Sequence, residues 1–484
     1  MRIPLVISTL VARSVGVVSR LSGRGGGTTL PGRVLNTLDP GAGARLAKKL
    51  AQGSAVISAT NGKTTSAAMV AAILSSRFRL AGNPAGANLS SGVATALLHT
   101  RGADLGLFEV DEAALPRVAA TLRPRALCLG NLFRDQLDRY GELEMLAERW
   151  RGVVAGLAAE STLIVNEDDP QLAQLARGRE GVIRFGIQDA RHGGPLPHAA
   201  DARYCSNCGA AYDYRLAYVG HLGEYSCPGC GFERLKPDIW AEEIELDGLR
   251  GSRFRLHLGS GLARNNVTGE LLHARPDPVY VGLALPGLYN VYNALAAAAL
   301  GHALGASANE IASGLESTEA AFGRSERIEI GEKRLLLLLI KNPTGANEVV
   351  RTIVADGTPQ TLVIALNDGI ADGQDVSWIW DVDFEPLLGG LERLIASGGR
   401  AAELALRFKY AGFPESRIEL VPSPAEALDR GLELTEAGGE LVVCPTYTAM
   451  LELQKVLAER GHADLYWQRA ARARKESGLP RHPR

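Results

Sequence analysis

Short apolar segments alternate with longer helix-compatible segments over most of the chain. In the first half, the strand-like segments lie at 54–58, 105–110, 126–130, 162–165, 242–258 and 279–284. An alanine-rich helix is predicted at 290–304. Strands that alternate with helices predict an α/β fold with a mostly parallel sheet, covered by helices on both faces.

A second α/β unit is predicted after a boundary near residues 320–328. Its strand candidates are 335–340, 361–366, 417–420 and 440–444. The pattern predicts four regions: an N-terminal helix and glycine-rich loop at 1–45, a first α/β domain at 46–320 with an insert at about 200–240, a C-terminal α/β domain at 325–465, and a basic tail at 466–484.

Composition narrows the class of protein. The chain has 484 residues, is 46% hydrophobic and carries a formal net charge of −2, so binding to nucleic acid through bulk charge is not expected. No apolar run approaches the ~20 residues that span a bilayer. Residues 3–12 are apolar, but Arg13 follows them without a clear cleavage site. We expect a first helix packed on the body near a membrane surface, in a cytoplasmic protein.

The segment 54–65 carries the clearest catalytic signal. An apolar strand at 54–58 leads into Ala59-Thr60-Asn61-Gly62-Lys63-Thr64-Thr65, and a helical segment follows. Backbone N–H groups at such a helix start face phosphates, Lys63 supplies a positive charge, and the Thr64 hydroxyl can hold Mg²⁺. The early glycine of the general phosphate loop is replaced by Ile57. The expected ligand is ATP.

Polar residues follow two neighbouring strands. The strand at 105–110 ends in Glu109, Asp111 and Glu112, and Glu109 is the predicted second ligand of Mg²⁺. The other acids could simply cap the next helix. The strand at 126–130 runs into the polar loop 131–142, which is a normal place for substrate contacts or for surface ion pairs.

Four cysteines form a metal-binding pattern. Cys205 and Cys208 are separated by two residues, as are Cys227 and Cys230, and 18 residues lie between the pairs. Two such turns present four thiolates to one tetrahedral Zn²⁺. A set of four thiolates leaves no position for a catalytic water, so a structural role is expected.

Three further residues are candidates for nucleotide contacts. Asn290 and Asn293 begin the alanine-rich helix, where side-chain amides could bind an adenine edge or cap the helix. Arg324 stands at the predicted domain junction, where it could reach a phosphate or form an ion pair.

In the C-terminal unit, an acidic loop with two tryptophans follows the strand at 361–366. Between Asp368 and Asp383 lie five acidic residues together with Trp378 and Trp380. Tryptophan beside acidic groups is typical of a binding face, although a loop over a core tryptophan is the alternative.

Taken together, these segments resemble the Mur ligase family, ATP-dependent enzymes that activate carboxylates as acyl phosphates. The resemblance covers about residues 40–460. It implies a Mur ligase-like ATP-binding domain with an inserted zinc ribbon, followed by a Rossmann-like domain. The residues that carry it are Ala59–Thr65, Glu109–Ala113, the 131–142 loop, Asn166–Pro170 and the pair Asn290 and Asn293.

Within that family the chain is similar to the MurT-type subunits of lipid II isoglutaminyl synthases. The matching segments are 23–28, the 131–142 loop, the four-cysteine insert, 341–348 and 375–381. The resemblance implies ATP-dependent amidation of the D-glutamate α-carboxylate of lipid II in peptidoglycan biosynthesis. It also implies a GatD-type glutamine amidotransferase partner that releases ammonia. Asp375, or Asp372 close by, is then expected to complete the partner's catalytic triad.

The chain departs from ordinary Mur ligases at several positions. Gln136 replaces a histidine, and the region Glu148–Arg151 has no lysine that could be carbamylated, so two residues of the family's usual second Mg²⁺ site are not present. The N-terminal nucleotide-sugar domain has no room here, which suits a lipid-linked substrate.

Two other functions fit parts of the sequence. A stand-alone Mur ligase or folylpolyglutamate-type ligase would use an amino acid and need no partner. A nucleic-acid-binding NTPase with a zinc ribbon would need a basic surface around 205–230, where Arg215 and His221 stand against Asp213 and Glu224.

Overall fold

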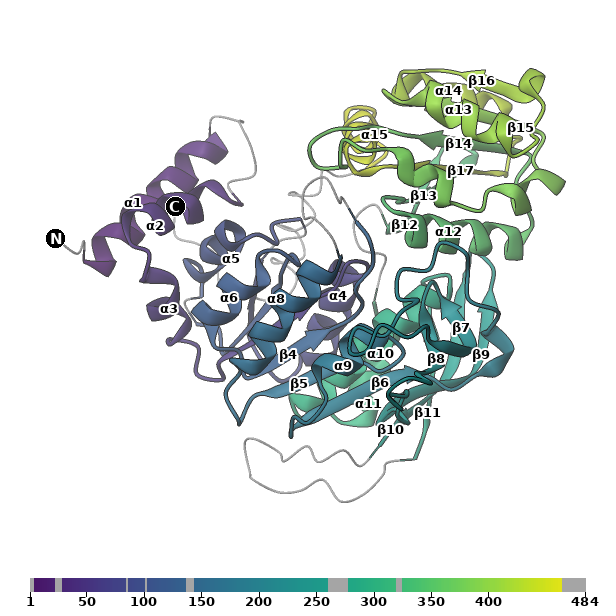
Figure 1. Ribbon diagram of the computed structural model, residues 1–484. Coiled ribbons are helices and arrows are strands. Elements are labelled where there is room, and N and C mark those ends of the chain that lie inside the picture. The colour runs from purple at the N-terminus through teal and green to yellow at the C-terminus, as the bar shows by residue number, and fades with distance from the viewer. Residues whose placement is uncertain are drawn as a thin grey trace. The chain divides into compact units, whose positions relative to one another are not determined.

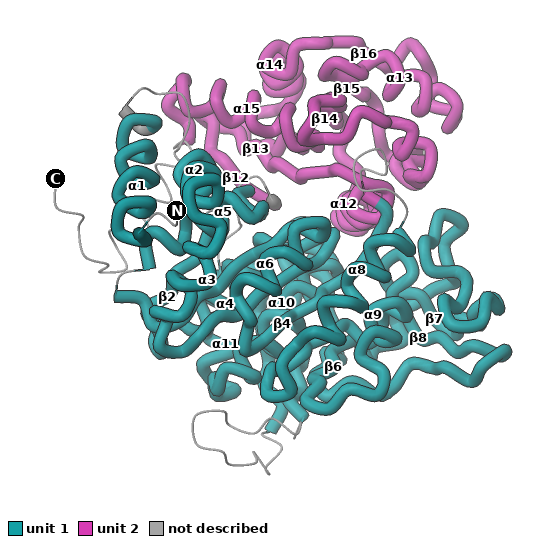
Figure 2. Tube along the Cα trace, turned by 60° about the vertical axis from the view of Figure 1, so that its left-hand side comes forward, with its two compact units in different colours: residues 1–134, 140–319 teal, residues 135–139, 320–484 magenta. Residues whose placement is uncertain are grey.

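The computed structural model describes residues 4–21, 28–83, 86–100, 102–135, 143–259, 277–318 and 324–463. The chain divides into two compact units, which are residues 1–134 with 140–319 and residues 135–139 with 320–484 (Figure 2). Each unit is built around its own sheet.

The first unit contains a nine-stranded sheet in the order β11-β10-β9-β6-β5-β4-β1-β3-β2 (Figure 1). The strands are β1 Ser54–Ser58, β2 Leu80–Gly82, β3 Leu105–Glu109, β4 Ala126–Leu129, β5 Thr162–Asn166, β6 Val182–Ile187, β9 Ile239–Asp247, β10 Gly251–Leu258 and β11 Val279–Leu283. All pairs from β2 to β9 are parallel, whereas β10 pairs antiparallel with β9 and β11. The predicted strands are confirmed. Two strands of this sheet were not predicted: β2 at the edge of the sheet and β6 between β5 and β9.

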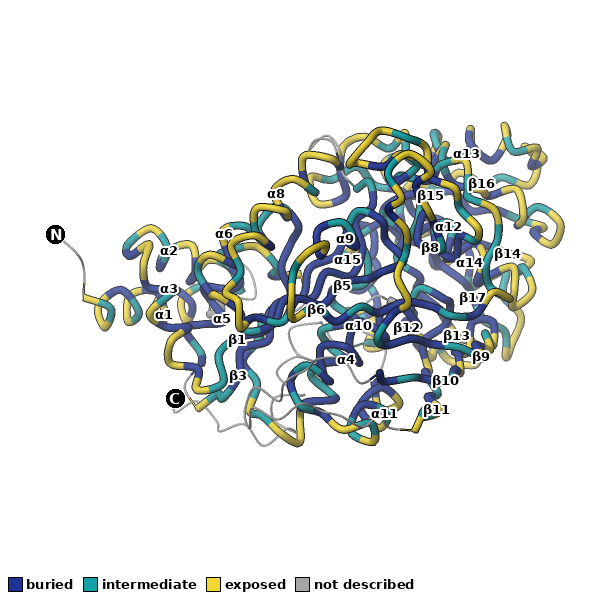
Figure 3. The backbone as a smooth tube through the Cα atoms, turned by 60° about the horizontal axis from the view of Figure 1, so that its bottom comes forward, coloured by how far each residue is buried: buried dark blue, intermediate teal, exposed yellow. Residues whose placement is uncertain are grey.

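Helices cover both faces of this sheet, as the alternating pattern predicted. On one face pack α4 Lys63–Leu74 and α10 Leu288–Ala303, with α11 Ala308–Glu316 against α4. On the other face pack α6 Leu115–Leu122, α8 Leu143–Ala155 and α9 Pro170–Leu175. Because both faces are covered, every residue of β1 and β3 is buried, and the middle of each strand is apolar (Figure 3).

Four short elements precede or flank the sheet at its β2 edge. They are α1 Leu5–Leu21, α2 Leu30–Leu38, α3 Ala42–Ala47 and α5 Ser90–Leu97. At Gly32 a Cβ would overlap the Ser91 carbonyl, so only glycine lets α2 lie this close to α5. The predicted packing of the first helix on the body is confirmed, since Ser8 and Ala12 of α1 are fully buried. Among the described helices, none combines the length and apolarity needed to cross a bilayer.

The second unit contains a six-stranded sheet in the order β12-β13-β17-β14-β15-β16. The strands are β12 Arg324–Ile330, β13 Lys333–Leu338, β14 Thr361–Ala365, β15 Arg393–Ser397, β16 Ile418–Leu420 and β17 Glu440–Pro445. Only β12 runs antiparallel to its neighbour. The helices are α12 Pro343–Asp356, α13 Ala401–Tyr410, α14 Pro424–Leu434 and α15 Tyr447–Glu459. Leu335 and Leu337 pack into one core with Leu428 of α14 and Leu453 of α15, as expected for alternate residues of a strand.

Candidate nucleotide site and metal centre

The turn between β1 and α4 has the geometry of a phosphate-binding loop. Gly62 lies directly before α4 with φ +85°, in the left-handed region. A Cβ at this position would overlap the Asn293 side-chain amide, so only glycine fits. The first N–H groups of α4 have no partner within the helix, and they are the groups that a phosphate would occupy.

The loop that follows β4 holds the phosphate-binding loop in place. The Asn131 side-chain oxygen accepts from the Asn61 N–H at 2.8 Å, and the Asn131 carbonyl accepts from the Thr60 N–H at 3.0 Å. The Thr60 hydroxyl accepts from the Phe133 N–H at 3.0 Å. This polar loop was predicted to make substrate contacts or surface ion pairs. Its first residues brace the turn at 60–61, and Arg134 and Asp135 form ion pairs with Asp201 and Lys341, respectively. Residues 136–142 lie outside the described residues.

Lys63 forms a buried ion pair that the sequence did not reveal. Its Nζ lies 2.6 Å from Glu112 Oε2, and both side chains are almost fully buried. Nζ also donates to the Ala59 and Thr60 carbonyls, which curls the loop around the charge. Glu112, considered as a helix cap, is therefore the counter-ion of the lysine. Asp111 accepts from the Ala113 N–H and does act locally in the turn.

Trp150 supports this ion pair from α8. Its indole Nε1 donates to the Glu112 carbonyl at 3.0 Å, and the side chain is fully buried. The residue stands in the Glu148–Arg151 region, where no lysine is available for carbamylation. At this point α8 supports the backbone of Glu112 through the buried Trp150 side chain.

Thr64 and Glu109 are placed as two ligands of one Mg²⁺ would be. Thr64 Oγ1 lies 3.1 Å from Glu109 Oε1. Adjacent ligands of octahedral Mg²⁺, each at 2.0–2.1 Å from the ion, lie about 3 Å apart. The Asn83 side chain bonds both the N–H and the carbonyl of Glu109 and so fixes the backbone at the end of β3. The two oxygens could therefore hold one Mg²⁺ between them.

The other residues predicted to contact the nucleotide differ in what the structure shows of them. Asn293 Nδ2 donates to Asn290 Oδ1 at 3.0 Å, and Asn290 in turn donates to the Pro286 carbonyl. Both asparagines are buried, and Asn293 lies against Gly62, which makes it a support of the phosphate-binding loop. Thr65 is buried in the first turn of α4. Arg324 begins β12, and its side chain lies outside the described residues, so its role stays a prediction.

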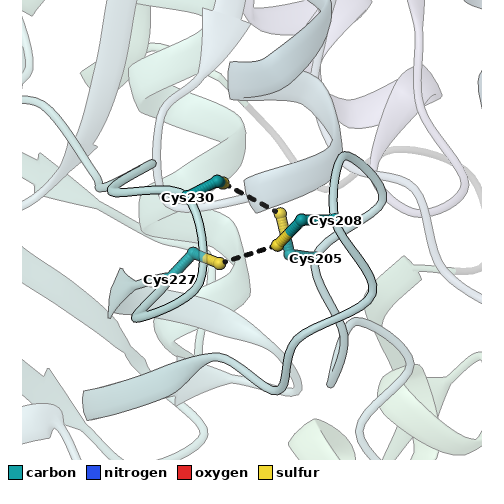
Figure 4. A group of neighbouring side chains, drawn as sticks. All are labelled: Cys205, Cys208, Cys227 and Cys230. Atoms are coloured by element: carbon teal, nitrogen blue, oxygen red, sulfur yellow. Dashed lines mark hydrogen bonds between the residues drawn. The ribbon is translucent and has the colours of Figure 1, made fainter.

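The four cysteines converge as predicted (Figure 4). Their Sγ atoms all lie within 4.8 Å of one another, with 3.7 Å between Cys205 and Cys230 and 3.4 Å between Cys208 and Cys227. Four thiolates about 2.3 Å from one tetrahedral Zn²⁺ lie about 3.8 Å apart. In each turn, a glycine with positive φ donates back to the first cysteine carbonyl; these glycines are Gly209 and Gly231. The cluster can hold a metal ion.

This ribbon, with its strands β7 Asp213–Val219 and β8 Leu222–Ser226, is tied to the nine-stranded sheet by buried polar contacts. Arg234 Nε lies 2.6 Å from Asp168 Oδ1, and the Tyr225 hydroxyl donates to the Glu167 carbonyl. Asp168 also accepts from the hydroxyl of Tyr292, the neighbour of Asn293 on α10. Burial raises the pKa of Glu167 to about 7. The ribbon is therefore a packed part of the first unit.

In the second unit the structure distinguishes the two candidate aspartates. Asp372 is buried and accepts from the Gly369 N–H and from both the N–H and the hydroxyl of Thr448, so it holds its own loop on α15. Burial raises its pKa. Asp375 is exposed, and hydrogen bonds from Ser377 lower its pKa, which keeps it ionised. Asp375 is the carboxylate that another protein can reach.

Two residues that sequence reasoning missed hold the segment after Asp375. Arg407 of α13 is buried and donates to the carbonyls of Ile379 and Val382. Asn347 of α12 accepts from the Asp383 N–H at 2.7 Å. Asn347 lies within the 341–348 motif, which was a signal, but its partner lies 36 positions away and nothing local indicates it.

Comparisons with known proteins agree with this geometry. The model of the Mur ligase middle domain matches residues 57–206, and that of the MurT ligase C-terminal domain matches residues 339–450. The MurT subunit of lipid II isoglutaminyl synthase from Streptococcus pneumoniae is 33% identical over 95% of this chain and 98% of the relative. The same subunit from Staphylococcus aureus N315 is 29% identical over 89% and 93%. A pseudomurein peptide ligase type C from Methanothermus fervidus is similar in structure, with TM-score 0.64, 22% identity and coverage of 86% and 80%.

The fold and the phosphate-binding turn define the chain as a Mur ligase-type protein, with an α/β ATPase-type unit, an inserted cysteine ribbon and a C-terminal α/β unit. At the level of sequence, it belongs to the family of MurT subunits of lipid II isoglutaminyl synthases.

Proposed function

We propose that this chain is the synthetase subunit that amidates the D-glutamate α-carboxylate of lipid II to D-isoglutamine, with ATP and ammonia. A carboxylate has no leaving group, so ATP first converts it to an acyl phosphate, which ammonia then attacks with loss of phosphate. The observation that carries the proposal is the phosphate-binding turn with its Thr64–Glu109 pair, in a chain that matches curated MurT subunits over nearly its full length.

Different residues of the chain have different proposed roles in phosphate transfer. Residues 60–65 and the start of α4 would hold the triphosphate, and Lys63 would offset the charge that develops on it. Thr64 and Glu109 would hold Mg²⁺, which draws charge from the phosphate oxygens when bound. Asn290 and Asn293 would support the turn, and Arg324 is proposed as a further contact with the nucleotide.

Ammonia must come from another subunit, because no cysteine of this chain suits glutamine hydrolysis. All six cysteines are described: four form the metal cluster, and Cys128 and Cys444 are buried. Burial raises the thiol pKa of each of these two to about 12, which suppresses the nucleophilic thiolate. We propose a GatD-type glutamine amidotransferase as the partner, with Asp375 completing its Cys–His pair.

An exposed aromatic face that includes Trp380, a few residues after Asp375 in the chain, supports this partner. Trp380 is 46% and Tyr410 73% exposed, and their rings meet edge to face at 5.7 Å. Leu406, also exposed, lies one turn before Tyr410 on α13. Arg407 donates to the carbonyl of Ile379, the residue before Trp380, and its guanidinium group lies against the face of the Trp380 ring. A rigid tryptophan with a buried support is a typical anchor of a protein interface.

Replacing Trp380 with alanine is therefore expected to weaken the complex by about 2 kcal/mol or more, close to 30-fold in Kd. Titration calorimetry with the purified amidotransferase subunit measures this. Leu235→Ala is the matched control, because Leu235 is 50% exposed and belongs to the first unit. Equal losses in the two variants would show that the Trp380 face is not the interface.

We propose that the cysteine cluster binds one structural Zn²⁺. Cys227→Ser, or removal of zinc by a chelator, is expected to lower the melting temperature by about 5 °C or more, because the ribbon packs on residues 167–168. Metal analysis should find one zinc per chain in the wild type and none in the variant. Ser226→Ala, at the exposed neighbouring position, should change neither value. A zinc-free protein with an unchanged melting temperature would contradict a structural role.

We further propose that the chain is organised into the regions 1–45, 46–320, 325–465 and 466–484. We also propose that the protein acts at the cytoplasmic face of the membrane.

The reaction itself is tested with the chain alone, supplied with lipid II, ATP, Mg²⁺ and a high concentration of ammonium. Amidated lipid II and ADP should form in equal amounts. A folded chain that forms neither would overturn the proposal.

A further inference from the structure

The first helix has its large apolar side chains on the outside. Val6 is 68%, Leu10 57% and Val18 64% exposed, and Ile7, Val11 and Val17 are exposed as well. The buried stripe of α1 consists of the small residues Ser8, Ala12 and Gly16, spaced four apart. A helix on the surface of a water-soluble domain normally shows the opposite arrangement, with large apolar residues inward.

The inward stripe accounts for how α1 is attached. Ser8 donates to Asp39 at 3.4 Å, and a Cβ at Gly16 would lie 3.0 Å from the Pro31 ring of α2. Arg13 donates to the Leu98 carbonyl at the end of α5. Because these contacts use small and polar groups, the large aliphatic side chains contribute little to holding α1 on the body. Their placement calls for another explanation.

The outward face also forms a groove. A shallow apolar cavity of about 550 Å³ lies along α1 and is lined by Leu10, Val11, Val15, Val18 and Leu30, with two serines. Continuous exposed apolar surface of this kind marks contact with another protein or with lipid.

The charge of the N-terminal segment favours lipid over another protein as the partner of this face. The first 38 residues contain five arginines, at positions 2, 13, 20, 24 and 33, and no aspartate or glutamate, although acidic residues slightly outnumber basic ones in the whole chain. An apolar helix face in a segment without acidic residues and with a net positive charge complements an anionic lipid surface, where the apolar side chains enter the acyl boundary and the positive charge of the segment is attracted to the headgroups.

We propose that the outward face of α1 docks on an anionic lipid bilayer and holds the subunit where a lipid-linked substrate is presented. The inference rests on the proposed function for its purpose, but the docking itself needs neither nucleotide nor lipid II. The residues of α1 belong neither to the turn at 60–65 nor to the segment that contains Asp375.

The test compares vesicle binding of the full chain, alone and in complex with its amidotransferase subunit. Sedimentation with vesicles of equal parts phosphatidylglycerol and phosphatidylcholine should retain the wild type, and pure phosphatidylcholine vesicles should retain much less. The triple variant Val6→Ser, Leu10→Ser, Val18→Ser should bind the anionic vesicles about tenfold more weakly or worse. The control variant Leu235→Ser, Tyr280→Ser, Leu420→Ser removes equally exposed apolar side chains elsewhere and should bind as the wild type does.

Activity assays separate this inference from the proposed function. The α1 variant should amidate lipid II in detergent micelles normally and lose turnover on lipid II in anionic vesicles. Undiminished vesicle binding by the α1 variant would overturn the inference. So would loss of wild-type self-association in that variant, which would make a second copy the occupant, or vesicle binding that the amidotransferase subunit abolishes. Inactivity in micelles with intact vesicle binding would instead count against the proposed function.

Discussion

Removing the positive charge at Lys63 is expected to reduce amide formation by about 10³-fold or more, the usual effect of losing a preorganised group that stabilises charge in the transition state. Lys63 is the buried cation at the start of α4, and its ammonium group already lies among loop carbonyls and Glu112. ADP release and amide formation should fall together, since both depend on the same phosphate transfer.

The single variant Lys63→Ala leaves Glu112 buried without a counter-ion, which costs about 3–5 kcal/mol in comparable buried pairs. The double variant Lys63→Met, Glu112→Gln removes both charges and so isolates the catalytic effect from the folding defect. Lys409→Ala, an exposed lysine of α13 paired with Glu415, is the matched control and should remain fully active. A folded double variant with wild-type turnover would show that the phosphate is held elsewhere.

Replacing Asp375 with asparagine is expected to separate the two nitrogen sources. Turnover with glutamine should fall by about 10⁴-fold, as when a triad loses the carboxylate that orients its histidine. Turnover with high ammonium should stay close to that of the wild type, because Asp375 is an exposed residue of the second unit, whereas the phosphate-binding turn at 60–65 belongs to the first unit. Both rates are measured on the reconstituted complex by product analysis.

Two neighbouring carboxylates serve as controls. Asp383→Asn removes an exposed charge from the same segment and should leave both rates unchanged. Asp372→Asn disturbs the carboxylate that receives N–H groups from Gly369 and Thr448, so it should lower the melting temperature of the second unit. If Asp375→Asn reduces both nitrogen sources equally, Asp375 is not the cross-subunit residue.

The sequence predicted those parts of the site whose signals are local. A strand, a glycine and a Lys-Thr pair within twelve residues specify the turn at 60–65, and two close cysteine pairs specify the metal cluster. The position of Glu109 opposite Thr64 also followed, because parallel strands end at the same edge of a sheet. In these cases short spacing and strand direction together determine which side chains meet.

The supporting contacts could not be predicted, because they join residues far apart in sequence that have common alternative roles. Glu112 could cap a helix as well as neutralise Lys63, and only the closing of the 60–65 turn over β3 decides between them. From the sequence, Asn293 could be a residue that caps the start of a helix. Only the structure shows its contact with Gly62. Similarly, the separation of Asp375 from Asp372 depends on burial, which a short acidic loop does not reveal.

Transfer of nitrogen from glutamine into lipid II tests the central claim most directly. The chain and its amidotransferase partner are incubated with lipid II, ATP, Mg²⁺ and glutamine labelled at the amide nitrogen, and the stem peptide is sequenced by mass spectrometry. We expect label on the α-carboxamide of D-glutamate, one ADP for each labelled amide, and no label without ATP. Label that appears without ATP, or an intact complex that consumes ATP and leaves that carboxylate free, would contradict the claim.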